Sequence, residues 1–522
     1  MRKSQAVRLD KTDPVELEVF RQLLESTASE MGTVLRKTSF SANIKERRDY
    51  SCAVYDAHGE TIAMGDHMPV HLGAMPLSVR EAIQSFALQP GDVVLLNDPF
   101  RGGTHLPDIT AVAGVFFEDA PRPEYYVASR AHHADVGGMS PGSMPLAREI
   151  YQEGLRIPPI RLIREGELDR PLLDLILANV RTPLEREGDL MAQLMALKRG
   201  EVRLREMAAR YGLPRCRQLT SALKDYSERM MRAQLRRLPQ GRFEFADSLD
   251  GGLIVKVAVT LSQGSATVDF TGSSPQADAP VNANFAIALS ASMYVFRCLI
   301  EEDVPYTEGL VRPIDVIAPL GTVVNAREPA AMAAGNVETS QRITDVVLGA
   351  LAQAAPDRIP AASAGTMSNI SFGGTTSAGK RFAYYETIAG GHGAGSAQDG
   401  ASGTHSHMTN SWNTPIEAFE HNYPVRIGRY SLRRGSGGGG RYRGGDGIVR
   451  ELEFLTDVEF TLLADRRERG PYGLSGGQAG EPGAAALIRG RSTTVLPGRT
   501  RLELQAGDRI RIETPGGGGW GV

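Results

Sequence analysis

The chain has 522 residues, of which 41% are hydrophobic, and its acidic and basic residues nearly balance at a formal net charge of -3. This length exceeds one ordinary hydrophobic core, so we expect a globular protein of about two to four lobes. The balanced charge argues against binding to nucleic acid or an anionic membrane, and no segment approaches the roughly eighteen apolar residues of a membrane span. Three dispersed cysteines and an N-terminus without an apolar signal region favour the cytoplasm.

The first predicted element is a long amphipathic helix. Asp13 and Pro14 form a helix start, with Asp as the N-cap and Pro at the first helical position. Apolar residues keep helical spacing to about Lys37. The spacing of the apolar residues then changes, and two strand-like runs, residues 52–55 and 61–64, predict a β-hairpin.

Polar residues lie close to this hairpin on both sides. Asp49 stands immediately before the first strand and two residues after Arg47, so a surface ion pair is its ordinary interpretation and a metal-binding carboxylate the alternative. His67 and His71 are four residues apart, but Pro69 between them argues against a continuous helix. We interpret these histidines as loop or substrate-pocket residues.

The first group of candidate metal ligands follows a predicted buried strand at residues 93–96. His105 and Asp108 lie three residues apart in the Gly- and Pro-punctuated segment NDPFRGGTHLPDIT. Imidazoles and carboxylates at strand ends are the ligands that a divalent metal needs, although a single loop histidine is more often a surface residue.

The second group follows the apolar run 125–131, which reads as another buried strand. It consists of His132, His133 and Asp135. Neighbouring side chains on a strand face opposite sides, so one of the adjacent histidines should be the ligand and the other a supporting or substrate-facing residue. The mixed His and carboxylate set, without cysteine, suits Mn, Fe, Co or a catalytic Zn with an open position.

The rest of the chain divides by its pattern. Residues 137–159 are irregular and are interpreted as a lid or a partner-facing loop, and residues 169–238 are predicted to be nearly all helical. Strands resume at Gly241, and glycine becomes abundant after position 365. We predict a multi-lobed α+β fold with an N-terminal α/β lobe carrying the metal site at 1–165, a helical subdomain at 166–240, an α+β lobe at 241–365 and a Gly-rich, mostly antiparallel β lobe at 366–522.

Two glycine-rich motifs imitate nucleotide-binding loops. In residues 374–381, Arg381 stands where a phosphate loop needs Ser or Thr, and the flanking residues read as two strands of a hairpin. Gly435, Gly437 and Gly440 satisfy G-x-G-x-x-G, but a strand follows where a helix is required. The sequence therefore supports no nucleotide site in this chain.

A third glycine-rich segment, beginning at Gly390, contains His405 and His407, which would share one face of an extended segment. A flexible loop and a second metal site are the alternatives to a substrate pocket. We assign His405, His407 and Asn410 to substrate binding, together with Arg47 and His71.

Several longer blocks carry a resemblance to a known family. The blocks ERRDYSCAVYDAHGE, GDVVLLNDPFRGGTHLPDIT, AHHADVGGMSPGSMP, HSHMTNSWNTPIEAFE and the PGGGGWG tail resemble the hydantoinase B/oxoprolinase family over essentially the whole chain. The pattern is similar to the second subunit of N-methylhydantoinases, the second half of 5-oxoprolinases and the large subunit of acetone and acetophenone carboxylases.

The resemblance implies a division of labour and a set of ligands. A hydantoinase A-type partner would bind ATP and phosphorylate the substrate, and this chain would complete the reaction. The family's metal residues fall on Asp49, His105, Asp108 and His132 or His133. We assign His132 to the metal and His133 or Asp135 to proton transfer, while the choice between the adjacent histidines stays open.

We therefore expect the metal-dependent hydantoinase B-type component of an ATP-dependent cyclic amide hydrolase of the hydantoinase or 5-oxoprolinase type, working in a hetero-oligomer on a small cyclic amide. The divalent metal would be Mn, Zn, Fe or Co, and ATP would be bound by the partner. One alternative is the large subunit of an acetone- or acetophenone-type carboxylase. The other is a scaffold subunit without catalytic activity.

Overall fold

The computed structural model describes residues 13–65, 67–117 and 121–522. The N-terminal stretch on which the absence of a signal region was argued lies almost entirely outside the described residues. The first described element is α1 (Pro14–Thr38), and the Asp13 side chain accepts a hydrogen bond from the Val15 amide at 3.0 Å, which confirms the predicted cap.

An antiparallel sheet forms the centre of the N-terminal part, with the strand order β2-β1-β5-β4-β3-β6-β7. Its strands are β1 (Tyr50–Asp56), β2 (Thr61–Met64), β3 (Val93–Leu96), β4 (Asp108–Val115), β5 (Tyr125–His132), β6 (Ile160–Arg164) and β7 (Glu167–Leu168). The predicted hairpin of β1 and β2 is confirmed. Both central runs are buried strands, as their apolar composition predicts.

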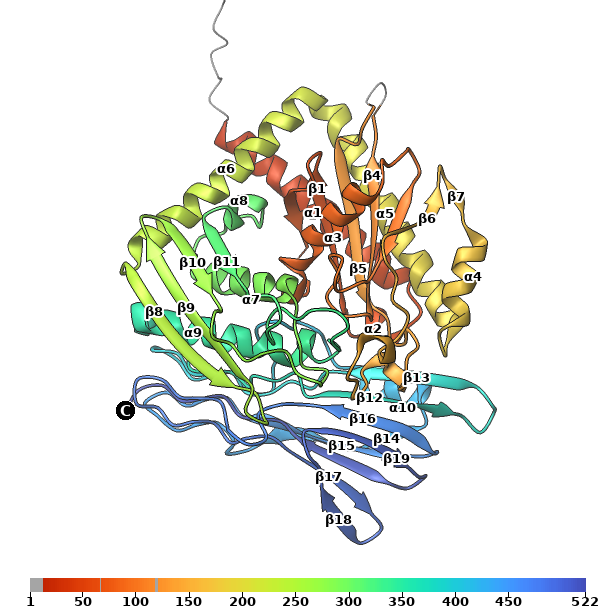
Figure 1. Ribbon diagram of the computed structural model, residues 1–522, viewed down its shortest axis with the longest axis vertical. Helices are drawn as coiled ribbons and strands as arrows, with labels where there is room; N and C mark the ends of the chain where they lie inside the picture. Colours follow the sequence, from red (N-terminus) through yellow and green to blue (C-terminus); the bar gives the residue numbers. More distant parts are fainter. Residues whose placement is uncertain (1–12, 66, 118–120) are drawn as a thin grey trace, which may run out of the picture.

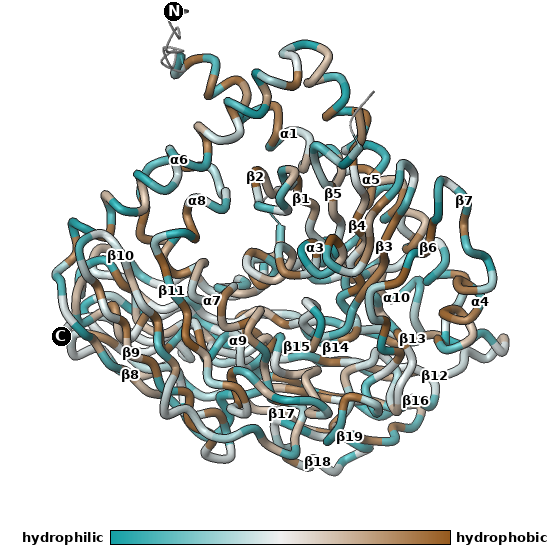
Figure 2. Tube along the Cα trace, turned by 45° about the horizontal axis from the view of Figure 1, so that its top comes forward, coloured by the Kyte–Doolittle hydropathy of each residue, from teal (hydrophilic) through white to brown (hydrophobic). Residues whose placement is uncertain are grey.

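Helices cover both faces of this sheet (Figure 1). Alternate residues of β1 show the division, since Cys52 and Val54 pack with α1 and α5 (Pro183–Tyr211), whereas Ala53 and Tyr55 pack with α3 (Ala74–Ser85). A strand covered on both faces has no polar side, and this explains the continuous apolar runs in the sequence. Figure 2 shows hydrophobic segments along these inner strands.

The predicted helical stretch is confirmed as α4 (Arg170–Ala178), α5 and α6 (Leu213–Arg237). Leucines 190, 194 and 197 of α5 and leucines 219 and 223 of α6 belong to the same hydrophobic core as one face of the sheet. These helices therefore share a core with the N-terminal strands. Within the described residues, no helix has both the length and the apolar composition needed to cross a bilayer.

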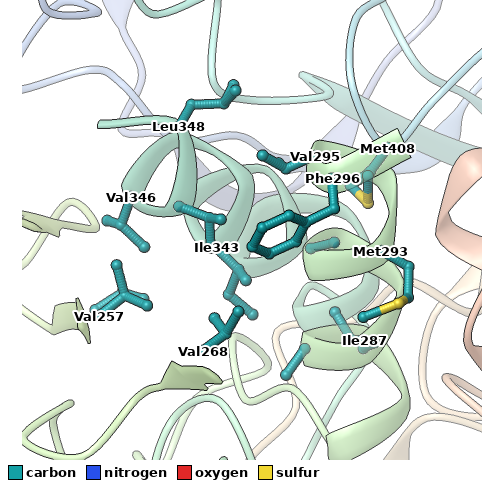
Figure 3. Packing of buried hydrophobic residues seen from close by; sticks show 14 of the residues in the cluster. Val257, Val268, Ile287, Met293, Val295, Phe296, Ile343, Val346, Leu348 and Met408 are labelled. Carbon is teal, nitrogen blue, oxygen red and sulfur yellow. The ribbon is translucent and has the colours of Figure 1, made fainter. Parts of the chain in front are cut away.

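The next lobe packs helices against a second sheet of strand order β11-β10-β9-β8. Its elements are β8 (Gly241–Ser248), β9 (Ile254–Ser262), β10 (Ser265–Asp269), α7 (Phe285–Cys298), α8 (Glu308–Val311), β11 (Ile314–Ile317) and α9 (Ser340–Ala354). Figure 3 shows its core, in which Val257 and Val268 of the sheet face Ile343 and Val346 of α9, beside Phe296 of α7.

The C-terminal part contains two further sheets, of strand orders β13-β12-β16-β19 and β14-β15-β20-β17-β18. The strands are β12 (Asn369–Thr375), β13 (Arg381–Glu386), β14 (Val425–Arg433), β15 (Gly447–Phe454), β16 (Val458–Leu463), β17 (Ala484–Arg489), β18 (Ser492–Val495), β19 (Arg499–Leu504) and β20 (Arg509–Glu513). The phosphate-loop lookalike connects β12 to β13, and its rejection as a nucleotide loop agrees with this hairpin.

Short helical pieces complete the chain. They are α2 (Ala42–Lys45), η1 (Pro69–His71), η2 (Pro141–Ser143), η3 (Ile150–Gln152), η4 (Gly335–Thr339), η5 (Pro356–Arg358) and α10 (Ile416–Asn422). Figure 1 shows the C-terminal sheets, in blue, lying beneath both the N-terminal sheet and the lobe that contains α7 and α9. Helices and antiparallel sheets thus form the predicted multi-lobed α+β fold.

Candidate metal centre

The centre is built at the start of β4 and the end of β5. In the antiparallel register of these strands, Asp108 lies opposite His132, so their side chains project from the same face. His105 reaches the same point from the turn that leads into β4. The Nε2 atom of His105 lies 3.3 Å from Asp108 Oδ1, and the Nδ1 atom of His132 lies 3.5 Å from that oxygen.

These three side chains are buried, with exposed fractions of 0%, 1% and 2%. Each offers one ligand atom, and among the described residues these atoms form a group lying within 4.8 Å of one another. The structure therefore brings together the two predicted groups of ligands. It also separates the adjacent histidines, because His133 is not part of this group.

The other oxygen of Asp108 is held by donors. Thr104 Oγ1 donates to Asp108 Oδ2 at 2.8 Å, and His71 Nε2 lies 3.4 Å from the same oxygen. The Ser51 hydroxyl accepts from the Met68 amide and lies 2.8 Å from His71 Nδ1. If the hydroxyl donates its hydrogen bond to Nδ1, the hydrogen of neutral His71 lies on Nε2 and points toward Asp108. His71, assigned to substrate binding, thus lies beside the ligand carboxylate.

The tautomer of His105 is set by a backbone carbonyl. Its Nδ1–H donates to Ala333 O at 3.2 Å, which leaves the Nε2 lone pair facing Asp108. The loop that carries Ala333 is held in turn by Glu153, whose Oε1 accepts from the amides of Met332 and Ala333 at 2.7 and 2.8 Å. Glu153 thereby fixes the peptide whose carbonyl orients the His105 ring, although it is far from His105 in sequence.

His132 is oriented by stacking. Its ring lies parallel to that of Tyr385, with centroids 4.3 Å apart and an interplanar angle of 12°. Arg47 donates to Tyr385 O at 3.1 Å and its guanidinium lies 5.0 Å from the tyrosine ring centroid. Arg47 is fully buried. This residue, assigned to substrate binding, lies beneath the tyrosine that supports His132.

Asp49 lies beside the three ligands but outside their tight group. Its carbonyl accepts from the His132 amide at 3.0 Å, and its carboxylate is 3.9 Å from Arg47 Nη1. The side chain is buried, not on the surface where an ordinary ion pair would place it. Burial raises the pKa of Asp49, against the opposing charges of His132 and Arg47.

The electrostatics of the centre favour an ionised Asp108. Burial alone would raise its pKa, but the nearby imidazoles of His105, His132 and His71 hold the pKa of Asp108 well below its usual range. Burial lowers the pKa of both His71 and His132, despite the nearby carboxylate. Burial alone would lower the pKa of His105, but Asp108, the Ala333 carbonyl and Glu153 together raise it.

This donor set fits a divalent cation. Neutral imidazoles keep a lone pair for a metal, and an ionised carboxylate supplies charge at the same point. His132 Nε2 is buried and finds no hydrogen-bond partner within the described residues. A buried imidazole nitrogen without a partner calls for an explanation, and a bound ion would supply one.

The two residues assigned to proton transfer lie away from the ligand group. His133 Nε2–H donates to Gln193 Oε1 at 2.9 Å, on the α5 side of the sheet. Asp135 pairs with Arg181 at 3.1 Å and accepts from the Gly137 amide. The opposite orientation of His132 and His133 agrees with strand alternation, and both hydrogen-bond sets tie the loop after β5 to the helical segment.

The glycine-rich segment also stands apart. His407 lines a cavity of about 380 Å³ with His392 and Tyr294, and the His405 carbonyl accepts from His392 Nε2 at 2.9 Å. Asn410 instead lines a polar cavity of about 590 Å³, together with His67, Arg21 and Arg297. Substrate-binding roles for His405, His407 and Asn410 stay predictions.

Sequence reasoning missed the residues that reach the centre from other lobes. Asn336, Glu153 and Tyr385 contact ligands or hold their supports, yet each is more than twenty residues away from the ligand it serves. A buried asparagine or glutamate has no periodic signature. Only the family blocks carried information about such distant contacts, and those blocks do not single out these three residues.

Comparison with known proteins identifies the relatives of this arrangement. The sequence profile described as hydantoinase B/oxoprolinase matches residues 13–522. The chain belongs to the hydantoinase B/oxoprolinase family. A protein of Pseudomonas sp. (strain NS671) assigned as the B component of a D-/L-hydantoinase is 31% identical over 98% of this chain and 90% of its own length.

Two further relatives of the family differ in how much of their length is matched. The 5-oxoprolinase 1 of Arabidopsis thaliana is 38% identical over 98% of this chain, but the match spans only 42% of the plant protein. The crystal structure of the ATP-dependent caprolactamase from Pseudomonas jessenii superimposes with a TM-score of 0.91 at 32% identity, covering 98% of this chain and 92% of the solved chain. The recognised family and its mixed fold are both confirmed.

Proposed function

We propose that this chain is the metal-dependent hydantoinase B-type component of an ATP-dependent hydrolase that opens a cyclic amide. The observation that carries the proposal is the buried group of His105, Asp108 and His132 in a chain similar to a caprolactamase. A lactam carbonyl is a poor electrophile and its amine a poor leaving group. Phosphorylation of the amide oxygen by an ATP-binding A-type partner would make the carbon reactive.

In this proposal His105, Asp108 and His132 hold the divalent cation, and Asp49 completes the set. A divalent cation supplies Lewis acidity at neutral pH. Thr104 fixes the second oxygen of Asp108, and the Ala333 carbonyl keeps His105 in the tautomer that a ligand needs. Burial of all three ligands excludes bulk water from the reacting atoms.

The proton-transfer step has three candidates on this chain. His133 and Asp135 remain the assignments from the sequence, each with a partner on the helical segment. His71 is better placed, because its Nε2 lies 3.4 Å from Asp108 and can give or take a proton at the edge of the ligand group. We therefore add His71 to the proton-transfer candidates.

The partner and the location follow as parts of the proposal. The match to the B component of a hydantoinase over most of both chains supports a hetero-oligomer with a separate A-type component. The match to less than half of the plant 5-oxoprolinase supports the same division, since the remainder of that protein has no counterpart in this chain. We propose that the complex works in the cytoplasm.

The test is reconstitution with a hydantoinase A-type protein from the same organism. Purified complex is given ATP, a divalent metal and a panel of hydantoins, 5-oxoproline and caprolactam, and ring opening is followed together with ADP release. We expect ring opening that needs both proteins, ATP and metal. Ring opening by the partner alone would reduce this chain to a scaffold.

A second arm of the experiment separates hydrolysis from carboxylation. The same complex is incubated with labelled bicarbonate and with acetone or acetophenone, and acid-stable label is counted. Hydrolysis predicts no fixed label and incorporation of solvent oxygen into the ring-opened acid. Fixed label with ketones, without ring opening of any cyclic amide, would replace the hydrolase assignment by a carboxylase.

A further inference from the structure

Asn336 brings a carboxamide to the ligand group from another lobe. It lies in the one-turn π-helix η4, directly before α9, and its exposed fraction is 4%. The turn has little freedom, because a Cβ at Gly335 would collide with the Asn282 carbonyl and the Ser340 hydroxyl holds the Asn336 carbonyl at 2.7 Å. Single π-turns occur frequently at functional sites.

The side-chain amide contacts two of the ligands. Its Nδ2 atom lies 3.1 Å from His105 Nε2 and 3.3 Å from Asp108 Oδ2. Its Oδ1 atom is buried and has no hydrogen-bond partner among the described residues. A half-satisfied buried amide is costly, so the unused oxygen calls for an explanation.

A bound cation would favour the opposite orientation of the Asn336 carboxamide. The lone pair of His105 that now faces Nδ2 is the one that a metal uses, and an N–H donor beside a cation is repelled. The two ends of a carboxamide have nearly the same shape, so a half-turn about its last bond exchanges them without new space. That half-turn would aim Oδ1 at the centre.

We propose that Asn336 is a further protein ligand of the metal centre, through Oδ1. This inference rests on the proposed metal-dependent function. Two imidazoles, the carboxylates of Asp49 and Asp108 and an amide oxygen would exceed the four ligands of tetrahedral zinc, and oxygen-rich sets suit Mn²⁺. The centre is then completed only when the lobe carrying η4 packs against the N-terminal sheet.

The test compares three substitutions in the purified full-length chain, with Mn²⁺ alone as the probe. Asn336→Asp keeps an oxygen but loses the donor, Asn336→Leu keeps the volume without either group, and Asn336→Ala removes both. Free Mn²⁺ is measured by electron paramagnetic resonance, and thermal unfolding is recorded with and without the metal. The fold is checked by circular dichroism.

We expect Asn336→Leu and Asn336→Ala to bind Mn²⁺ at least about tenfold more weakly than the wild type. Asn336→Asp should bind at least as tightly as the wild type. Without metal, Asn336→Asp should unfold at a lower temperature, because its carboxylate faces Asp108, and Mn²⁺ should raise its unfolding temperature more than that of the wild type.

Two results would overturn the ligand role. One is wild-type Mn²⁺ affinity in Asn336→Leu, and the other is weaker binding by Asn336→Asp than by Asn336→Leu, which would mean that only the N–H donor matters. A wild-type chain that binds no divalent cation would instead refute the metal-dependent function itself. The two failures are therefore distinguishable.

Discussion

Two buried clusters of ionisable side chains in this molecule are built by different chemical rules. The metal-centre cluster contains His71, His105, Asp108 and His132. The second, here called the junction cluster, contains Asp247, Arg342, Asp345, Asp465 and Arg466, and joins β8, α9 and the segment after β16.

The junction cluster pairs permanent cations with carboxylates. Arg466 Nη2 lies 2.6 Å from Asp345 Oδ2, and Arg342 Nη2 lies 2.8 Å from Asp465 Oδ1. An arginine cannot release its proton in a protein, so each of these carboxylates faces a cation that stays charged and has no lone pair to offer a metal. In the metal-centre cluster the carboxylate of Asp108 instead faces imidazoles. A neutral imidazole has a nitrogen lone pair that can bind a metal. The comparison teaches that burial and charge alone do not identify a site; carboxylates that face imidazoles able to coordinate a metal, and not permanent cations, do.

The largest effect is expected from removing a ligand. Asp108→Ala and His105→Ala should each lower metal affinity and turnover together by more than about a hundredfold, because even partners outside the ligand set change these quantities 10- to 100-fold. Metal content and ring opening by the reconstituted complex measure the two losses. His58→Ala, at an exposed turn, is the matched control and should change neither. Turnover that survives in a variant without metal would sink the metal-dependent account.

The junction cluster should respond in stability and not in metal binding. Arg466→Met leaves the buried Asp345 and the partly buried Asp247 without this cation, and breaking a buried pair costs about 3–5 kcal/mol. The exposed pair of Arg170 and Asp174 provides the control, because exposed ion pairs add little to stability and Arg170→Met should cost much less than Arg466→Met. Urea denaturation measures both. Equal losses of unfolding free energy in Arg466→Met and Arg170→Met would contradict a special contribution of the junction cluster to stability.

A smaller effect is expected from the carboxylate behind His105. Glu153→Leu removes the acceptor for the Met332 and Ala333 amides, so the carbonyl that orients His105 loses its support. Metal affinity should fall by about 10- to 100-fold. Glu153→Gln keeps a carbonyl oxygen at that place and should restore affinity to within about threefold of the wild type, since one acceptor is kept. Isothermal titration calorimetry measures the Mn²⁺ affinity of each variant. Equal affinity in Glu153→Leu and Glu153→Gln would contradict the role of Glu153 in orienting His105.

The smallest effect on the metal should come from the glycine-rich segment. His407→Ala alters a cavity that the ligand group does not share, so Mn²⁺ affinity should stay within about twofold of the wild type, as expected for sites without common partners. If His407 binds substrate as predicted, the variant should raise KM with little change in kcat. If His407→Ala lost as much metal affinity as a ligand variant, the cavity lined by His407 and the metal centre would belong to one site.

Much of the centre follows from local sequence rules. Strand alternation predicts that His132 and His133 face opposite sides, and the apolar runs predict that β3 and β5 are buried and end where the ligands stand. The spacing of apolar residues alone does not predict which residues of neighbouring strands lie opposite one another. The role of Asp49 came from the family resemblance, since an Asp near arginines has an ordinary surface interpretation.

The remaining contacts depend on how the lobes pack. Asn336 and Tyr385 lie more than two hundred residues from the ligands that they contact, and the sequence around them gives no periodic or motif signal. Residues 137–159 were interpreted as a lid or partner-facing loop, yet the segment carries the fully buried Glu153 and supports His105 from inside. An irregular composition does not distinguish a surface loop from an internal support.

The most direct measurement is the metal content of the purified chain, determined by mass spectrometry of its elements and repeated for Asp108→Ala. Converging imidazole and carboxylate ligands predict close to one divalent ion per wild-type chain and almost none in the variant. A folded wild-type chain that stays free of metal after incubation with Mn²⁺, Zn²⁺, Fe²⁺ and Co²⁺, yet supports full ring opening with its partner, would contradict the account.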